Sequence, residues 1–300
     1  MFTRQTHVFK VASDCEIKAE VFRSSDQAVR PVIFFLHGGA LILGDRHTLP
    51  QEQVEKYVGA GYAIVSIDYR LAPEVNFEAV IEDIEDGYRW MVEKGPDLFR
   101  VDPRRIVVVG HSVGGFLALL TGFRANPRPK VVSSFHGYGD PTGDWLSRPS
   151  NDYNAQPAVS REQAFHAMRG PVITGTAFAG DEFDSRNQFY LYCRQHGLWP
   201  KEVTGHCPHE EPKWYDQYCP LRNVTKSFSP TIFVHGEDDF DVPIEQPRLM
   251  LKELERHGVP HELVAVPGRG HSFDHENKGM KDPVVAGVFD KLLAFAAKHV

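Results

Sequence analysis

The sequence has few cysteines and no long hydrophobic run. Only 4 of its 300 residues are cysteine, and the opening stretch MFTRQTHVFK has no apolar core of the kind that a secretory signal carries. No segment approaches the roughly 18 consecutive apolar residues of a membrane span. We therefore expect a cytoplasmic protein with free thiols and no membrane span, not a disulfide-stabilised secreted domain.

Basic charge is also scarce. The chain carries 33 Lys and Arg against 40 Asp and Glu, a formal net charge of −7, and it has no basic stripe with interleaved aromatic residues. Nucleic acid is therefore not expected as a partner. The segment HCPH at 206–209, with Cys219 beyond it, lacks the paired spacing of zinc ligands. No metal site and no cofactor are expected.

What the chain does contain is a regular alternation of strand-like and helix-like segments. Hydrophobic residues make up 42% of the sequence, enough for the core of one large domain. Short apolar runs without polar breaks predict strands buried on both faces, and helical periodicity follows most of them. Buried strands are expected at 31–36, 62–67, 105–110 and 231–236, and further strands at 130–137 and 261–268. The helices are expected at 49–59, 77–94, 113–124, 244–257 and 281–298.

This alternation predicts an α/β fold, with a mostly parallel sheet and helices on both faces. Two N-terminal segments that alternate apolar and polar residues, 6–13 and 16–24, suit an antiparallel pair at the sheet edge. Residues 139–229 break the pattern, because they are rich in Pro, Gly, Asp, Asn and aromatic residues. We therefore expect a core made of 1–138 and 230–300, with 139–229 inserted as a cap or lid.

The hexapeptide GHSVGG places Ser112 between a predicted buried strand and a predicted helix. A tight turn there, made feasible by Gly110 and Gly114, would lift the serine hydroxyl above the carboxyl end of the sheet, where open α/β sheets bind ligands. The alternative is a serine that merely caps the helix. The hexapeptide alone favours neither interpretation.

A serine nucleophile needs a base and an acid that orients the base, and both follow later strands. The segment GRGHSF carries His271 after the last predicted strand. The segment HGEDDFDVP, after the strand before it, carries Asp238, Asp239 and Asp241. The chain order of serine, aspartate and histidine is that of α/β-hydrolases, but composition does not choose among the three aspartates.

The same chemistry needs donors for a developing oxyanion. The segment HGGA closes the first buried strand, and Gly38 and Gly39 lack the Cβ atoms that would keep their N–H groups from turning toward a bound carbonyl. The N–H of Val113, directly after the serine, would point the same way.

Taken together, HGGA, DYRLAPE at 68–74, GHSVGG, HGEDDFDVP and GRGHSF resemble the α/β-hydrolase superfamily. More narrowly, they resemble the hormone-sensitive-lipase-like and related HGG-motif carboxylesterases. The resemblance implies Ser112 as nucleophile, His271 as base and an oxyanion hole of Gly38, Gly39 and Val113. The family's G-x-x-D pattern implies Asp239 as the acid, which leaves Asp238 and Asp241 as solvated loop carboxylates.

The predicted function is hydrolysis of small or medium carboxylic esters through an acyl-enzyme intermediate, with a small-molecule ester as the partner. An amidase of the arylformamidase type is an alternative, because it too uses an HGG loop and a G-x-S-x-G serine. A ligand-binding protein on a hydrolase scaffold is another, although such proteins typically lose a member of the triad. A homodimer is left open.

Overall fold

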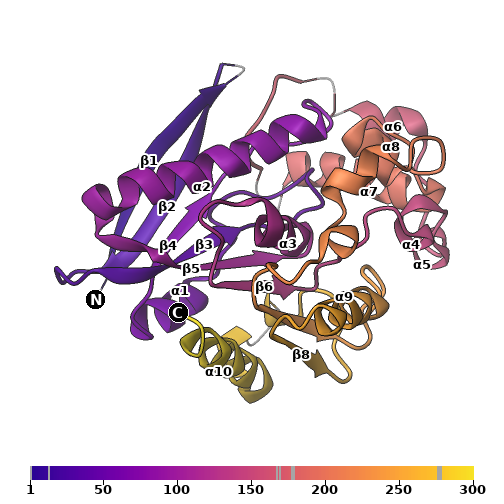
Figure 1. Ribbon diagram of the computed structural model, residues 1–300. Coiled ribbons are helices and arrows are strands. Elements are labelled where there is room, and N and C mark those ends of the chain that lie inside the picture. The colour runs from indigo at the N-terminus through magenta and orange to yellow at the C-terminus, as the bar shows by residue number, and fades with distance from the viewer. Residues whose placement is uncertain (1, 13, 167, 169, 177–179, 276–278) are drawn as a thin grey trace.

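The computed structural model describes residues 2–300 apart from 13, 167, 169, 177–179 and 276–278. Its centre is one sheet with the strand order β1-β2-β4-β3-β5-β6-β7-β8 (Figure 1). The strands are β1 Phe2–Ala12, β2 Cys15–Ser24, β3 Arg30–Leu36, β4 Ala63–Ile67, β5 Val101–His111, β6 Val131–Phe135, β7 Thr231–Gly236 and β8 His261–Val266.

The six strands from β4 to β8 run parallel to one another, and β1 and β2 form an antiparallel pair at one edge. Every residue of β4, β6 and β7 is buried. This burial accounts for their unbroken apolar sequences, because a strand covered on both faces needs apolar side chains on both. The predicted α/β fold class is therefore confirmed.

Helices cover both faces of the sheet (Figure 1). Phe34 of β3 packs in the apolar cluster that holds Tyr88 of α2, whereas its neighbour Phe35 packs in the cluster that holds Phe289 of α10. Successive strand residues point to opposite faces, so α2, α3 and α9 lie on one face and α1 and α10 on the other. These helices are α1 Gln51–Gly59, α2 Phe77–Phe99, α3 Val113–Arg124, α9 Glu245–Arg256 and α10 Pro283–Ala297, and two short turns, η4 Phe273–His275 and η5 Gly279–Lys281, precede α10.

The described parts of 139–229 are helices and loops that gather on one side of the molecule (Figure 1). Phe189 and Trp199 from this segment belong to the same apolar cluster as Phe116 of α3, so the segment shares its core with the sheet's helices. The division of the chain at 139 and 229 stays a prediction. The elements are α4 Asp144–Ser147, α5 Asn151–Asn154, α6 Arg161–His166, α7 Asp181–His196, α8 Trp199–Thr204, η2 Trp214–Tyr218 and η3 Pro220–Asn223.

Among the described residues, no helix is both long enough and apolar enough to cross a membrane.

Candidate active site

Ser112 lies at the junction of β5 and α3, in a strained backbone conformation. Its φ is 56° and its ψ is −121°, and its N–H donates to the carbonyl oxygen of Phe135 at 2.7 Å. Its hydroxyl makes no capping hydrogen bond to the helix, which speaks against the helix-cap interpretation. A non-glycine residue at this φ is costly, and such strain gathers at functional sites.

The glycines on either side are required by the turn itself. A Cβ on Gly110 would lie 1.9 Å from the carbonyl oxygen of Gly114, and a Cβ on Gly114 would lie 2.1 Å from that of Leu36. Both distances are far shorter than any real contact. The turn therefore admits no side chain at either position, as a strand-to-helix elbow that exposes its serine demands.

The three polar residues that follow β5, β7 and β8 meet at this turn. His271 Nε2 lies 3.0 Å from Ser112 Oγ, and His271 Nδ1 lies 2.8 Å from Asp239 Oδ2. Both separations are ordinary hydrogen-bond lengths. One ring thus connects the hydroxyl to the carboxylate, which is the geometry that proton transfer from a serine needs.

Asp239 is fixed from several sides. Its Oδ1 accepts hydrogen bonds from the backbone N–H groups of Asp241 and Val242, each at 2.9 Å, and His235 Nε2 lies 3.3 Å from its Oδ2. Burial opposes its ionisation, but the contacts with His235 and His271 outweigh burial and hold the pKa of Asp239 well below its usual range. Asp239 is therefore a carboxylate throughout the neutral range. Asp238, by contrast, is exposed.

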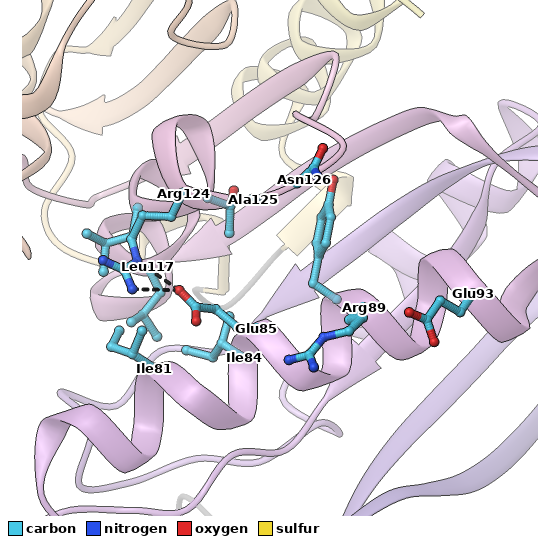
Figure 2. A pocket seen from close by; sticks show the side chains of 12 residues that line it. Ile81, Ile84, Glu85, Arg89, Glu93, Leu117, Arg124, Ala125 and Asn126 are labelled. Carbon is cyan, nitrogen blue, oxygen red and sulfur yellow. Dashed lines mark hydrogen bonds and ion pairs between the residues drawn. The ribbon is translucent and has the colours of Figure 1, made fainter.

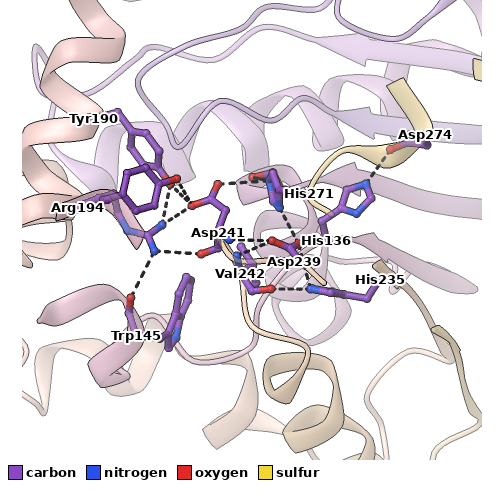
Figure 3. Close-up of polar contacts among 12 residues, drawn as sticks. His136, Trp145, Tyr190, Arg194, His235, Asp239, Asp241, Val242, His271 and Asp274 are labelled. Atoms are coloured by element: carbon purple, nitrogen blue, oxygen red, sulfur yellow. Dashed lines mark hydrogen bonds and ion pairs between the residues drawn. The ribbon is translucent and has the colours of Figure 1, made fainter. Parts of the chain in front are cut away.

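The expectation that Asp241 is a solvated loop carboxylate is wrong. Its Oδ1 accepts from Tyr153 Oη at 2.8 Å and Tyr190 Oη at 2.6 Å, and it pairs with Arg194 at 2.5 Å. Its other oxygen, Oδ2, lies 3.6 Å from His271 Nε2. Figure 3 shows Tyr190 and Arg194 converging on one side of Asp241 while His271 lies on the other. The partners come from α5 and α7, which no motif in the loop reveals.

His271 consequently lies between two carboxylates. Burial alone would lower the pKa of its ring, but the charges of Asp241 and Asp239 outweigh burial and raise the pKa above the usual value. The raised pKa makes the ring a stronger base, and it also keeps the ring protonated to a higher pH.

The glycine loop after β3 lies against the nucleophile. A Cβ on Gly38 would lie 2.9 Å from the carbonyl oxygen of His111 and 3.3 Å from Ser112 Cβ, so the backbone there has no room for a side chain. In the described part of the chain, the N–H groups of Gly38, Gly39 and Val113 donate to no protein acceptor. They are therefore available as donors beside Ser112.

The DYRLAPE segment supports this loop from behind. The ring of Tyr69 stacks on His37 at 4.0 Å between centroids, and its hydroxyl donates to the carbonyl oxygen of His37 at 2.9 Å. Arg70 forms a buried ion pair with Asp83 of α2 at 2.7 Å, which fixes the segment to the helix layer.

Two side chains from 139–229 hold the far end of the same loop, where Ala40 and Leu41 have φ values of 56° and 65°. Trp199 Nε1 donates to the carbonyl oxygen of Ala40 at 3.0 Å, and Arg186 Nε donates to that of Ile42 at 2.6 Å. No motif predicts that either residue contacts the loop, because the segment around them carries no family pattern.

Two cavities meet at Ser112. One of about 550 Å³ is lined by Gly38, Thr48, His111, Ser112, Asn187, Asp241, His271 and His275, among others. The other, of about 20 Å³, is lined by Ser112, Val113, Tyr138, Trp145, Trp199 and Val242, among others. A separate cavity of about 410 Å³ lies between α2 and α3, beside the ion pair of Glu85 and Arg124 (Figure 2). It shares no lining residue with the two at Ser112.

A second polar cluster behind the site was not predicted. His136 Nε2 lies 2.7 Å from Asp274 Oδ1, and Gln53 Nε2 donates to Asp274 Oδ2 at 3.0 Å. His111 and His275 approach the same carboxylate. The members of the cluster come from four separate parts of the chain, namely α1, the end of β5, the residue after β6, and η4, so no local sequence pattern reveals the cluster.

A family model described as the alpha/beta hydrolase fold matches residues 33–275. The chain belongs to this family. Within it, the resemblance to the hormone-sensitive-lipase-like esterases is confirmed.

Solved structures repeat the fold across the whole chain. A protein of unknown function from Staphylococcus aureus superposes with a TM-score of 0.78 at 19% identity, covering 100% of this chain and 99% of its own. An alpha/beta hydrolase superfamily protein from Enterococcus faecalis gives 0.75 at 21%, covering 99% of each chain. Carboxyl esterase 2 from Tuber melanosporum gives 0.70 at 21%, covering 99% of this chain and 87% of its own.

Curated relatives are parts of much larger proteins. The non-reducing polyketide synthase Preu6 of Preussia isomera is 29% identical over 318 residues, which cover 95% of this chain and 14% of the synthase. The synthase adrD of Penicillium rubens is 27% identical, covering 95% of this chain and 13% of its own length. The chain thus spans about one seventh of these relatives.

Proposed function

We propose that the protein hydrolyses carboxylic esters with Ser112 as its nucleophile. The observation that carries the proposal is the hydrogen-bonded path from Asp239 through His271 to Ser112, at 2.8 Å and 3.0 Å. The N–H groups of Gly38, Gly39 and Val113 beside it supply the donors that the developing oxyanion requires.

In the first half of the reaction, His271 Nε2 takes the proton of Ser112 Oγ as the oxygen attacks the ester carbonyl carbon. The three backbone N–H groups donate to the resulting oxyanion. The protonated ring then gives its proton to the departing alcohol oxygen as the carbon–oxygen bond breaks. In the second half, His271 deprotonates a water that attacks the acyl carbon. The protonated ring then returns the proton to Ser112 Oγ as the bond between the acyl carbon and Oγ breaks and the acid is released. Asp239 holds the ring in the required tautomer throughout.

The two cavities at Ser112 suggest the shape of the substrate. A space of about 20 Å³ is little more than the volume one water molecule needs, whereas the other holds about 550 Å³. Because Ser112 lines both, the groups on the two sides of the scissile carbonyl differ in size. We propose esters with one short part and one bulky part.

We further propose that 139–229 acts as the cap over this site. Asn187 and Tyr190 of α7 line the wide cavity, and Trp145 and Trp199 line the narrow one. The segment thereby supplies walls on both sides of the nucleophile.

Thioester hydrolysis is a second candidate function. It is favoured by the curated relatives, which are polyketide synthases similar over 95% of this chain. Acyl transfer from a thioester to serine uses the same nucleophile, base and oxyanion donors, so the site accommodates both reactions.

The cytoplasm is the proposed location. All four cysteines are free thiols, and Cys193 and Cys219 are buried. Burial raises the pKa of the Cys193 thiol, which makes it unreactive. Unpaired thiols of this kind are characteristic of a reducing compartment.

The test combines active-site labelling with a substrate panel. A fluorophosphonate probe should label the wild-type protein on Ser112, and failure to label it would favour a binding protein over a hydrolase. Turnover of p-nitrophenyl butyrate, a matching butyryl thioester and N-formylkynurenine should then rank ester, thioester and amide. Preferential turnover of the amide would overturn the ester proposal in favour of an arylformamidase-type enzyme.

A further inference from the structure

The cluster behind the active site brings three metal-ligating side chains together. His111 ends β5, and Asp274 and His275 lie in η4 after the His271 loop. His111 Nδ1 lies 2.8 Å from His275 Nε2 and 3.5 Å from Asp274 Oδ2, and the last two atoms lie 3.3 Å apart. Three potential ligand atoms from two separate segments thus lie within 3.5 Å of one another.

These separations match those around a tetrahedral metal ion. Zinc binds imidazole nitrogen and carboxylate oxygen at about 2.0 to 2.2 Å, which separates neighbouring ligand atoms by about 3.4 Å. Two of the three observed distances, 3.3 Å and 3.5 Å, lie at this value. The third, at 2.8 Å, needs the exposed ring of His275 to move outward by about half an ångström. Two histidines and one carboxylate with an open position are a recognised zinc donor set.

The charge at the cluster also favours a cation. Asp274 is fully buried, and its ion-pair partners in the described part of the chain are histidines, with no lysine or arginine among them. A buried carboxylate without a permanent countercharge is costly, and a bound cation would offset that cost.

The surroundings orient the carboxylate as the outer partners of metal ligands do. His136 Nε2 donates to Asp274 Oδ1 at 2.7 Å, and Gln53 Nε2 donates to Oδ2 at 3.0 Å. Such hydrogen bonds fix a ligand in its binding orientation. The side chain of His275 is 32% exposed and lines the wide cavity together with His111, which gives an ion a route from solvent.

We propose that His111, Asp274 and His275 form a binding site for a divalent transition-metal ion of the zinc type, open toward the wide cavity. The ion would join the end of β5, directly before Ser112, to the segment that carries His271. It would leave its remaining position to water or to a substrate oxygen. The proposal is independent of whether the protein hydrolyses esters, because it concerns binding.

The test is a titration of the whole chain with Co²⁺ and Zn²⁺ after treatment with EDTA. Wild type should bind one ion, with the strong visible absorption of tetrahedral Co²⁺ and a Zn²⁺-dependent rise in Tm. His275→Ala should weaken binding at least tenfold and lose both signals. Cys207→Ala, which removes the thiol of the surface segment HCPH, is the matched control and should bind as wild type does. The Tm of each variant in EDTA verifies folding.

Three results would overturn the proposal. The first is the absence of binding to wild type, and the second is equal binding by His275→Ala and wild type. The third needs no variant: an intense near-ultraviolet band from a cobalt–thiolate bond in wild type would place the ion on a cysteine.

Discussion

At the scale of single residues, the notable feature is the position of His271 between two carboxylates. Asp239 contacts one ring nitrogen at 2.8 Å, and Asp241 lies 3.6 Å from the other. Only the first contact can hold the tautomer that accepts the serine proton. The second acts through charge, because Asp241 Oδ1 already binds two tyrosines and Arg194.

This difference predicts a shift in pH dependence. The pKa of His271 is raised in the folded protein, with burial opposing the shift and the charges of Asp241 and Asp239 causing it. Since the neutral ring is the active base, kcat/KM should rise with pH through an inflection above the ordinary value of about 6.5. Asp241→Asn removes one of the two charges and should move the inflection to lower pH, as measured with an uncharged ester.

The matched control for that experiment is Asp238→Asn, since Asp238 is exposed. It should leave the inflection in place and keep kcat within about tenfold of wild type. Asp239→Asn should instead lower kcat by about 10⁴, because the tautomer is lost. If the inflection stays at the same pH in Asp241→Asn, the charge of Asp241 does not raise the pKa of His271.

Ser112→Ala should fold normally and lose ester turnover by about 10⁴ to 10⁶. The reason is that Ser112 Oγ is the group that His271 Nε2 contacts at 3.0 Å. Initial rates of the purified variant, with circular dichroism as the check on folding, measure the loss. A variant retaining a tenth of the wild-type rate would exclude Ser112 as nucleophile.

The sequence predicted the residues whose position follows from a strand end. Ser112, Asp239 and His271 each lie within a few residues of the end of a parallel strand, and parallel strands bring their carboxyl ends to one edge. It did not predict the environment of Asp241, because the partners of that carboxylate stand 47 to 88 positions earlier in the chain. Contacts of that range depend on how helices pack, which no local pattern encodes.

At the scale of elements, the glycine loop after β3, whose N–H groups we propose as oxyanion donors, is strained and is held by neighbouring elements. Gly39, Ala40 and Leu41 all have positive φ, at 104°, 56° and 65°, and the two non-glycine residues make this backbone unfavourable by itself. Trp199 at the start of α8 and Arg186 of α7 bind carbonyl oxygens in it. Segment 139–229, which we propose as the cap, therefore also supports the loop whose N–H groups we propose as oxyanion donors.

Trp199→Phe tests that support. The change keeps an aromatic ring but removes the N–H that donates to the carbonyl oxygen of Ala40, so the loop should sample other conformations. We expect kcat to fall about tenfold with little change in KM, less than the 10² to 10³ lost when an oxyanion donor itself is removed. Affinity for a boronic acid that mimics the tetrahedral intermediate should fall in parallel.

Trp214→Phe, in η2, provides the comparison, because the Trp214 ring packs on Tyr218 and His206 and lines neither cavity at Ser112. It should preserve kcat and boronate affinity. Equal losses in both variants would mean that the effect of Trp199→Phe comes from general loosening of the segment.

The elements themselves were predictable to different degrees. The strands were located to within a few residues, since short runs rich in β-branched residues and bounded by glycine, such as RIVVVG, favour a buried strand over a helix. Helix α2 was expected to end at residue 94 but continues to Phe99, through Pro96. The short helices α4 and α5 were not expected, because four residues are too few to show a helical period.

At the scale of the whole molecule, one apolar cluster extends from the sheet into 139–229. Phe34 of β3, Phe116 of α3 and Trp199 of α8 all belong to it, and Arg186 of α7 forms a buried ion pair with Glu74 at 2.8 Å. Removing segment 139–229 would expose this apolar surface of the sheet and its helices. The segment itself shares its core with them and has no separate core.

We therefore expect the segment and the sheet to unfold together. Three of the four tryptophans, Trp145, Trp199 and Trp214, lie in 139–229, so fluorescence reports mainly on that segment, while far-ultraviolet circular dichroism reports on the whole chain. In a urea titration the two signals should share one midpoint. A fluorescence transition that is complete before the ellipticity changes would show that the segment unfolds independently.

The hydrogen bonds from Arg186 of α7 and Trp199 of α8 to the loop after β3 have a consequence for activity at a lipid surface. A lipase that is activated at an oil–water interface swings a lid away and only then completes its oxyanion hole. Here the segment that we propose as the cap holds the loop after β3, through Trp199 and Arg186. Moving that segment away would release the loop whose N–H groups we propose as oxyanion donors. Reaction rates should accordingly follow dissolved ester and show no jump when the substrate begins to form droplets.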